Sequence, residues 1–176
     1  MKKVLNATAK VLHSIVSFLT TGIILTALAV AILYLAHIRP YVVLSGSMEP
    51  AIPVHSVCFV NENIPFAQIT PGEVISFRME GGMLVTHRVS AVQDGRCTTK
   101  GDANSIEDAV PVTADNYIGK TVAVIPGIGV VLILLHTTPG KICAGALILL
   151  LLVLSLIPQS KKDENPPERS EADETV

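Results

Sequence analysis

Residues 83–91, MLVTHRVSA, are the stretch of this chain that decides its fold. Successive side chains of a β-strand point to opposite faces, so a two-residue period separates an inner face from an outer one. One face here is apolar except for a single histidine, and it carries Met83, Val85, His87, Val89 and Ala91. The alternate positions include threonine, arginine and serine, which water solvates readily. The pattern therefore predicts a half-buried strand with a histidine on its inner face.

Short segments on both sides of this strand have the same character. They are rich in β-branched residues and are separated by proline, glycine and asparagine. The expected strands are Tyr41–Leu44, Val57–Val60, Val74–Phe77, Leu84–Val92 and Thr121–Val124. Residues 71–72, Pro-Gly, are typical of a turn, and residues 80–82, Glu-Gly-Gly, of a hairpin connection. Because nothing in this region has helical apolar spacing over three turns, we expect an all-β domain.

A long apolar segment precedes the β region. No lysine, arginine, aspartate or glutamate occurs between Lys10 and Arg39. Residues 15–38 are long enough to cross a hydrocarbon layer of ~30 Å at ~1.5 Å per residue. The alternative is a cleavable signal peptide, because residues 27–29, Ala-Leu-Ala, resemble a cleavage site. The apolar run exceeds the usual ~7–15 residues of such peptides, so we expect an uncleaved transmembrane helix.

A second apolar run, residues 142–158, has apolar side chains on every face, as a membrane-spanning helix does. Positive charge sets the expected orientation, because lysines and arginines gather on the cytoplasmic side. Three lysines precede the first span, and two lysines and an arginine follow the second, whereas only Arg39 and Lys141 flank the spans on the other side. We therefore expect residues 1–14 and 159–176 in the cytoplasm and the region between the spans outside it.

The region between the spans divides into two parts. Residues 39–125 are expected to form the extracytoplasmic β domain. The apolar stretch that follows is interrupted by proline and glycine and is short for a further crossing, so we expect residues 126–141 to lie in the membrane interface. The end of the chain, residues 159–176, is rich in proline and glutamate without apolar periodicity, and we expect it to be a disordered tail.

The composition narrows the class of protein. A mean hydropathy of +0.53 over 176 residues is unusual for a soluble domain and agrees with two spans. The net charge of −2 comes from residues 161–176, which hold three basic and six acidic side chains. The sequence has no basic patch of the kind that binds nucleic acid. Cys58 and Cys97 can pair only if their strands are neighbours, which the sequence leaves open, and Cys143 lies in an apolar run. Without a C-x-x-C pair, a structural zinc site has no support.

Ser47 lies within residues 45–50, SGSMEP, just after an expected strand. A serine hydroxyl becomes a nucleophile only beside a base and near donors that bind an oxyanion. His87 can be that base, because a partly buried imidazole is biased toward the neutral form that accepts a proton. The alternatives are an ordinary Ser-Gly turn before Pro50 and a hydrogen-bonded histidine of the core.

Asp102 and Asp108 are the acidic candidates, in a loop that also contains glycine, asparagine and serine. A carboxylate that accepts the Nδ1 proton of a histidine fixes its tautomer and stabilises its charged form. Both aspartates can instead cap turns, and a metal site formed by His87 and these carboxylates is a further alternative. Their spacing alone does not rank the two acids.

Three ordered motifs resemble a known family. SGSMEP at residues 45–50, THRV at 86–89 and KGDAN at 100–104, followed by Asp108, resemble the sequential motifs of type I signal peptidase. The resemblance includes the flanking membrane segments. The usual bacterial branch of that family has a lysine at the position of His87. The histidine therefore indicates the Ser-His-Asp branch of the endoplasmic reticulum and archaea, which some Gram-positive bacteria also carry.

The resemblance implies a role for each of these residues. Ser47 is the expected nucleophile and His87 its general base. Asp108 matches the triad aspartate of the family, and Asp102 matches a second important acid, so which of them completes the triad stays open. Ser45, together with the backbone at Ser47, is expected to form the oxyanion hole.

The family's fold implies a mainly β catalytic domain anchored by two transmembrane α-helices. The expected function is that of a membrane-bound serine endopeptidase, which removes signal peptides from secreted or membrane precursor proteins at the extracytoplasmic surface of a bacterial plasma membrane. The resemblance suggests substrates with small side chains at the first and third positions before the cut. The family usually has Gly-Asp where this chain has residues 55–56, His-Ser, so the chain departs from the pattern at this turn.

The expected partners are precursor proteins and membrane lipid, not nucleic acid, and a need for partner subunits stays open. No cofactor or metal is implied. Two other functions fit the same sequence less directly. One is a catalytically inactive, membrane-tethered β module that acts in assembly or binding. The other is a self-cleaving, repressor-like serine protease, against which the two spans and the histidine argue.

Overall fold

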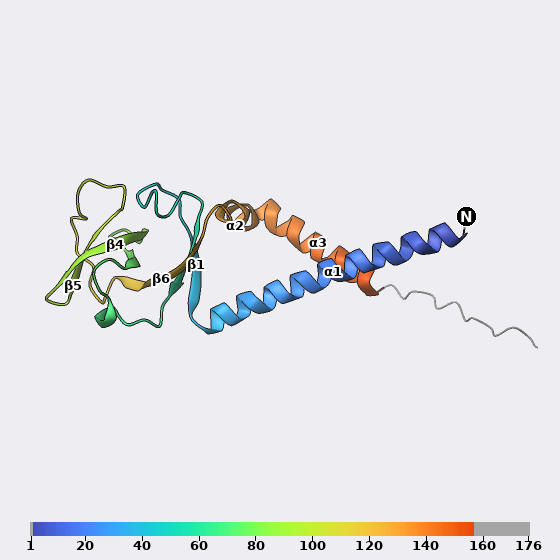
Figure 1. Cartoon of the computed structure of the whole chain (residues 1–176), viewed down its shortest axis with the longest axis horizontal. Helices are drawn as coiled ribbons and strands as arrows, with labels where there is room; N and C mark the ends of the chain where they lie inside the picture. Colours follow the sequence, from blue (N-terminus) through green and yellow to red (C-terminus); the bar gives the residue numbers. More distant parts are fainter. Residues whose placement is uncertain (1, 157–176) are drawn as a thin grey trace, which may run out of the picture.

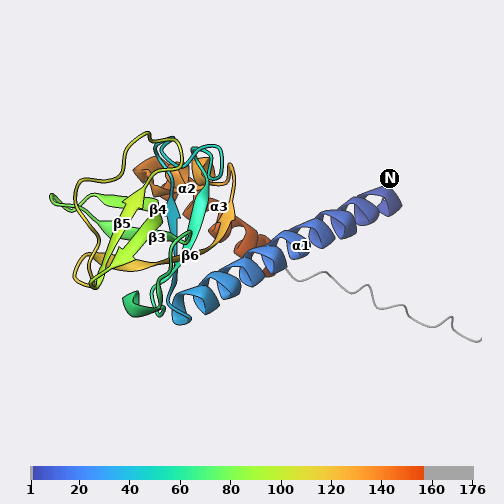
Figure 2. The ribbon, with the colours of Figure 1, turned by 60° about the vertical axis from the view of Figure 1, so that its left-hand side comes forward.

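The computed structural model describes residues 2–156, which form an elongated molecule (Figure 1). A β domain occupies one end, and two long helices extend from it on the same side (Figures 1 and 2). The elements in chain order are α1 (Lys2–Leu35), β1 (Ile38–Val42), β2 (Val57–Asn61), the short 3₁₀ helix η1 (Phe66–Gln68), β3 (Val74–Arg78), β4 (Leu84–Gln93), β5 (Arg96–Lys100), β6 (Tyr117–Ile125), α2 (Gly129–His136) and α3 (Thr138–Leu156).

The six strands form one antiparallel sheet in the order β1-β2-β6-β3-β4-β5. In the middle of β4, His87 lies opposite Ile75 of β3, and Val89 lies opposite Thr99 of β5. The register shifts once in each of the β2–β6, β3–β6 and β4–β5 pairs. Such bulges bend the strands that contain them, and the bulge in β4 falls just after Val89.

Two groups of buried apolar side chains form the core. The larger group is Ile69, Ile75, Phe77, Val89, Cys97 and Val112. The smaller group is Met48, Ile52, Cys58 and Val60. Met48 directly follows Ser47 in the chain, so the smaller core holds the loop that carries this serine.

The two long helices contain the segments that can cross a membrane. His13–Leu35 and Thr138–Ser155 have mean hydropathies of 2.4 and 1.9, and only 6% of each segment is buried within the molecule. A helix that exposes apolar side chains on nearly all sides is suited to lipid and not to water. The prediction of a mainly β domain anchored by two apolar helices is confirmed.

The junction between α1 and β1 is held by side chains. The guanidinium of Arg39 lies 3.4 Å from the centre of the Tyr34 ring, a cation–π contact. Its Nε donates to Glu62 of the β2 end at 3.4 Å, and the Tyr41 hydroxyl donates to the same carboxylate at 3.2 Å. The first strand therefore leaves the anchor helix in a fixed direction.

Some expected boundaries differ from the structure. The first helix ends at Leu35 and β1 begins at Ile38, so the end of the expected span, residues 15–38, already lies in the sheet. The strand β5 was not predicted, because its sequence RCTTK is largely polar. On β4, His87 and Val89 are buried as the alternation predicts, whereas Met83 is 61% exposed in the turn before the strand. The bulge after Val89 ends the regular alternation before Ala91.

The structure also shows that Cys58 and Cys97 do not form a disulfide. Cys58 and Cys97 are free thiols in different core groups, because β2 and β5 are not neighbours in the sheet. Burial raises the pKa of the Cys58 thiol to about 11. The expected disordered tail, residues 159–176, and the last two residues of the expected second span lie outside the described residues.

Candidate active site

Ser47 lies in the loop that joins β1 to β2. The neighbouring residue Met48 is 1% exposed, and its carbonyl accepts the N–H of Ile52, so the loop is fixed in the smaller core just after the serine. The carbonyl of Ser47 accepts the N–H of Ala103 at 2.8 Å. Ser47 is thereby held from both sides while its hydroxyl stays partly exposed.

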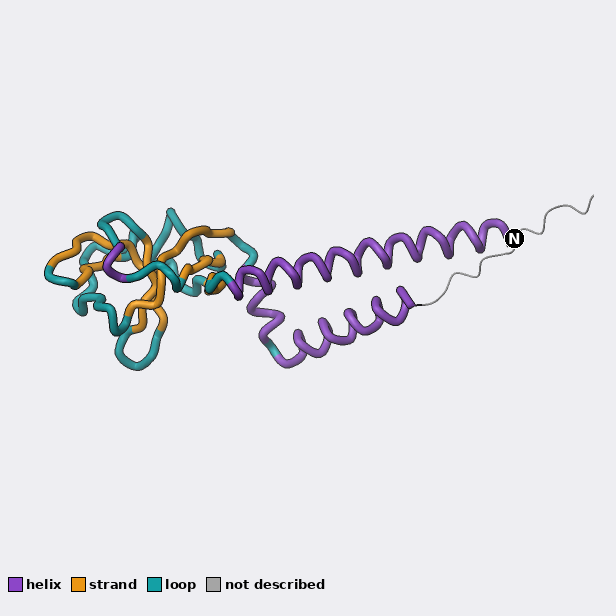
Figure 3. The backbone as a smooth tube through the Cα atoms, turned by 90° about the horizontal axis from the view of Figure 1, so that it is seen from below, coloured by secondary structure: helices purple, strands orange, loops and turns teal. Residues whose placement is uncertain are grey.

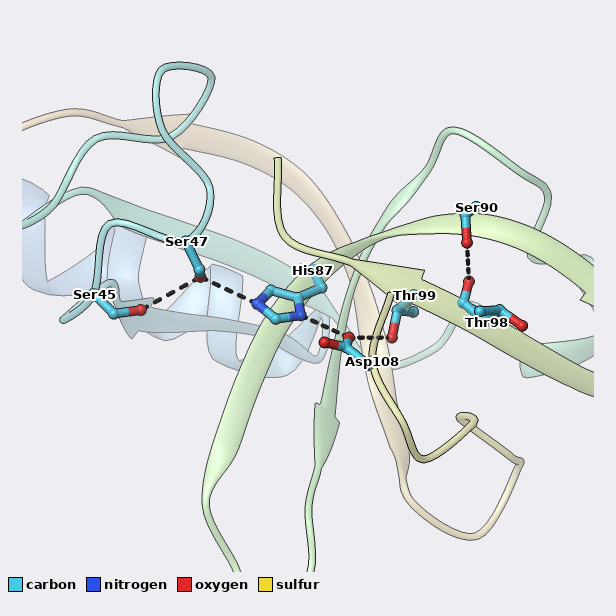
Figure 4. Close-up of polar contacts among 7 residues, drawn as sticks. All are labelled: Ser45, Ser47, His87, Ser90, Thr98, Thr99 and Asp108. Carbon is cyan, nitrogen blue, oxygen red and sulfur yellow. Dashed lines mark hydrogen bonds and ion pairs between the residues drawn. The ribbon is translucent and has the colours of Figure 1, made fainter. Parts of the chain in front are cut away.

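His87 faces this hydroxyl from the middle of β4 (Figure 4). Its Nε2 lies 3.1 Å from the Oγ of Ser47, although 40 residues separate the two in the sequence. The residue is 7% exposed, and its ring packs edge-on against Phe77. Burial on a strand fixes the imidazole in one orientation, with one edge toward the serine.

Asp108 faces the other nitrogen of the same ring. Its Oδ2 lies 2.7 Å from Nδ1 of His87 (Figure 4). An ionised carboxylate only accepts hydrogen bonds, so Nδ1 carries the proton and Nε2 is free to accept the Ser47 hydroxyl. Ser47, His87 and Asp108 therefore form one chain of hydrogen bonds that can move a proton from the serine to the imidazole.

Thr99 on β5 fixes the carboxylate of Asp108. Its hydroxyl donates to Oδ2 at 2.6 Å, and its backbone carbonyl accepts the Asp108 N–H at 2.8 Å. The side chain is fully buried. Sequence reasoning missed this residue because β5 was not predicted. The only signal for it was a threonine just before the KGDAN motif.

Asp102 does not contact His87. It pairs instead with Arg88, whose Nε and Nη2 donate to its two carboxylate oxygens at 2.8 and 2.7 Å. These hydrogen bonds hold the pKa of Asp102 below its usual range. The two aspartates that the sequence could not rank thus have different partners, and only Asp108 faces the histidine.

The Arg88–Asp102 pair helps to hold the serine in place. Asp102 lies between Gly101 and Ala103, the two residues that touch the backbone of Ser47. A side chain at Gly101 would bring its Cβ to 2.6 Å from the Ser47 carbonyl oxygen, so only glycine allows this close approach. Fixing Asp102 therefore fixes the loop that presses against Ser47.

Ser45 lies at the open side of the site. Its hydroxyl is 3.4 Å from the Ser47 Oγ (Figure 4). The N–H of Ser47 makes no backbone hydrogen bond within the described residues, so it can still donate. One free N–H and one nearby hydroxyl are the kinds of donor that stabilise an oxyanion. Within residues 2–156, no group of three or more histidine, cysteine, aspartate or glutamate side chains is arranged to hold a metal ion.

The departure at residues 55–56 has a structural explanation. His55 adopts a positive φ of 63°, in the left-handed region that glycine enters without strain. Histidine therefore occupies here a backbone conformation that glycine adopts more readily. Ser56 is fully buried, and its hydroxyl donates to the carbonyl of Pro53 at 2.6 Å.

Comparisons with known proteins identify one family. Residues 15–128 match the family described as "Signal peptidase, peptidase S26". The chain is 38% identical over 78 residues to signal peptidase I W of Bacillus subtilis, which covers 42% of this chain and 41% of that protein. It is 34% identical over 112 residues to the signal peptidase complex catalytic subunit sec11 of Dictyostelium discoideum, covering 56% of this chain and 61% of the relative. It is 32% identical over 111 residues to the human signal peptidase complex catalytic subunit SEC11C, and the match covers 56% of this chain and 57% of that protein. The chain thus spans less than two thirds of the length of each of these relatives.

Proposed function

Because the chain belongs to the signal peptidase family S26, and within it to the type I signal peptidases of the endoplasmic-reticulum type, we propose that it is a membrane-bound serine endopeptidase that removes signal peptides from precursor proteins. The observation that carries the proposal is the hydrogen-bonded series Ser47–His87–Asp108. Its substrates are secreted or membrane precursors that carry a signal peptide.

In the proposed mechanism, the Oγ of Ser47 attacks the carbonyl carbon of the scissile bond while Nε2 of His87 takes its proton. Asp108 stabilises the imidazolium that forms. The C–N bond then breaks, and the same proton passes from Nε2 to the leaving amine. Water, deprotonated by His87, hydrolyses the acyl-enzyme and regenerates the Ser47 hydroxyl.

Two donors are proposed to bind the negative oxygen of the tetrahedral intermediate. One is the N–H of Ser47, which has no backbone partner in the described part of the chain. The other is the hydroxyl of Ser45, which can rotate toward the oxygen from its place beside Ser47. Asp102 acts as a positioning residue, because its pair with Arg88 holds the loop against the Ser47 backbone.

The proposed location is a bacterial plasma membrane, with the β domain outside the cytoplasm and both ends of the chain inside. The two apolar helices support the membrane attachment, and the flanking lysines and arginines support the orientation. Two of the relatives are named as catalytic subunits of a signal peptidase complex. Whether this chain needs partner subunits is part of the test.

The test is cleavage of a secretory precursor in cells and by the purified full chain in detergent. We expect Ser47→Ala and His87→Ala each to lower the rate by at least about 10³-fold, with the double variant no slower than either one. Ser90→Ala is the matched control, because Ser90 lies on the same strand but is exposed, and its hydroxyl donates to the Thr98 carbonyl and not to the candidate site (Figure 4). It should cleave at the wild-type rate.

Each result decides between alternatives. Undiminished cleavage by Ser47→Ala would overturn the catalytic assignment. A wild-type chain that processes no precursor in cells would leave the inactive β module as the better reading. Cleavage in cells but not by the purified chain would indicate required partner subunits.

A further inference from the structure

The helix α2 has no evident role in the proposed chemistry. It has the sequence GVVLILLH, and only Thr137 separates it from α3. Val131 is 52% exposed and Leu134 is 60% exposed, and Ile125 and Ile128, which precede the helix, are each 45% exposed. Gly129 is its only buried residue. A helix without a polar face that lies open on several sides is not a water-facing element of a soluble domain.

The direction of α2 differs from that of its neighbours. In Figure 1, α2 is seen almost end-on, whereas α1 and α3 run along the long axis of the molecule. Figure 3, turned by 90°, shows the same segment running across that axis before α3 begins. If α1 and α3 cross a bilayer, α2 therefore lies parallel to its surface, at the end of the spans that meets the β domain.

The corner between α2 and α3 is built to keep this direction. The Thr137 hydroxyl donates to the carbonyl of Leu134 at 2.7 Å and accepts the N–H of Gly140 at 3.1 Å. Gly140 packs so closely on the Leu134 carbonyl that no side chain fits there. The change of direction at Thr137 is thus fixed by hydrogen bonds and by a glycine, and does not depend on a flexible linker.

The other end of α2 is fixed to the loop that carries Ser47. The N–H of Gly129 donates to the His55 carbonyl at 2.9 Å, and a Cβ on Gly129 would come within 2.5 Å of that oxygen. His55 in turn donates to the Val43 carbonyl at 2.9 Å. Residues 43–56 are therefore closed into a loop whose base rests on α2.

We propose that α2 lies in the bilayer surface, with its side chains among the upper parts of the lipid acyl chains, and that it sets the height of the Ser47 loop above the membrane. The occupant of the apolar surface is lipid, because only Thr137 separates α2 from α3, the helix proposed to cross the membrane. This inference rests on the proposed membrane attachment of α3, and goes beyond it by placing a third helix in the membrane. The apolar face of an amphipathic interfacial helix is buried about 5–10 Å into the boundary between headgroups and acyl chains, and we expect the apolar α2 to reach at least that region.

The chain contains no tryptophan, so a single introduced tryptophan reports its own surroundings. We would place it in α2 as Val131→Trp and, independently, as Leu134→Trp, two exposed positions with room for a larger ring. Leu149→Trp, near the middle of the α3 segment, is the control for a buried span. Ile106→Trp, which is 77% exposed in the loop after β5, is the control for water.

The full-length variants are reconstituted in phosphatidylcholine vesicles that contain lipids brominated either high on the acyl chain or near its end. We expect both α2 variants to lose about half or more of their emission to the high bromines and less to the deep ones, as interfacial burial requires. Leu149→Trp should be quenched more by the deep bromines, and Ile106→Trp by neither. Circular dichroism checks that each variant keeps the wild-type fold. If one of the two α2 variants does not fold, the other α2 variant provides the measurement.

The two proposals fail in different ways. If Leu149→Trp is quenched but the α2 variants are as little quenched as Ile106→Trp, the inference about α2 is overturned and the membrane attachment of α3 still holds. No quenching of Leu149→Trp would overturn the attachment itself and, with it, the inference. Blue-shifted α2 emission without quenching would also overturn the inference, because it would mean that protein, and not lipid, covers the helix.

Discussion

The Oδ2 atom of Asp108 has two partners, Nδ1 of His87 at 2.7 Å and the hydroxyl of Thr99 at 2.6 Å. Because the backbone of Thr99 also accepts the Asp108 N–H, the carboxylate is fixed before any substrate binds. A group fixed in advance need not be ordered during the reaction, which lowers the barrier. We therefore assign Thr99 as a positioning residue that acts on His87 through Asp108.

Replacing Thr99 with valine keeps the shape of the side chain and removes the donor. We expect kcat on a signal-peptide substrate to fall about 10-fold with KM unchanged, because a hydrogen bond to a charged group contributes about 1.5 kcal/mol. Thr99→Ser keeps the hydroxyl and should recover most of the rate. Steady-state kinetics of the purified chain measure both variants. If the serine variant were as slow as the valine variant, packing and not the hydrogen bond would explain the loss.

The Arg88–Asp102 pair should make stability depend on pH. Hydrogen bonds from Arg88 lower the pKa of Asp102 from an ordinary value of 3.8, so the folded state favours the ionised carboxylate. This stabilisation is fully present above the unfolded-state pKa and is lost as the pH falls through the lower folded-state pKa. Asp102→Asn should therefore reduce the free energy of unfolding by about 1–3 kcal/mol at pH 7.

The difference between wild type and Asp102→Asn should shrink as the pH falls below the unfolded-state pKa, and it should be lost below the lower folded-state pKa, where the folded wild-type carboxylate is also neutral. Denaturant unfolding in detergent micelles at neutral and acidic pH measures it. Asp115→Asn is the matched control, because Asp115 is exposed and has no ion pair among the described residues. A constant difference across this pH range would show that the pair does not stabilise the fold through its charge.

At this scale, sequence reasoning can name candidates but cannot pair them. A serine after a strand, a histidine on an apolar face and aspartates in a polar loop are local features, so Ser47, His87 and both acids could be proposed. The partner of each acid depends on the path of the loop in space. Arg88 lies next to His87 in sequence but on the opposite face of β4, and it pairs with Asp102. Asp108 is left to face the histidine.

At the scale of elements, hydrophobic alternation predicts most of the sheet but not its edge. β5 has only two inward side chains that are fully buried, Cys97 and Thr99, and its other positions are polar or charged. Its place is set by the hairpin before it, where Asp94 and Gly95 both have positive φ, as tight β-hairpins require. Because the position of β5 depends on this turn and on its pairing with β4, the amino-acid composition of the strand alone does not predict it.

The contact between α2 and the Ser47 loop can be tested with a matched pair of glycines. A Cβ at Gly129 would meet the His55 carbonyl at 2.5 Å and a Val42 methyl group at 2.8 Å, whereas a Cβ at Gly145 in α3 would meet nothing within 4 Å. We expect Gly129→Ala to cost about 1–3 kcal/mol of stability through overpacking and to slow cleavage by moving the loop. Gly145→Ala should be neutral or slightly stabilising. Unfolding in micelles and kcat measure the two effects, and equal behaviour of the pair would contradict a tight contact at Gly129.

At the scale of the whole molecule, a short stretch of chain links the candidate site to the apolar helix α1. β1 begins three residues after α1 ends, and Ser47 follows Ile38 by nine residues. An extended chain covers at most about 3.3–3.6 Å per residue, so the serine lies within ~30 Å of that point. The tip of the β4–β5 hairpin belongs to the same domain, and it is not one of the two junctions at which the β domain joins α1 and α2. If α1 crosses the bilayer as proposed, the candidate site therefore lies no more than ~30 Å from the membrane. The tip of the β4–β5 hairpin offers a place to probe on which side of the membrane the domain lies.

The distribution of positive charge predicts that this side is outside the cytoplasm. We expect trypsin added to sealed cells to cut at Arg96, which is exposed at the hairpin tip, because exposed loop tips are the preferred sites of proteolysis. Peptide tags fused to the two ends of the chain should stay intact under the same conditions, because both ends are proposed to be cytoplasmic. Detergent is the control, since it should make both tags accessible and leave cutting at Arg96 unchanged. Loss of both tags in sealed cells with Arg96 protected would reverse the orientation. Loss of only one tag would mean that just one of the two helices crosses the membrane, because two crossings place both ends on the same side.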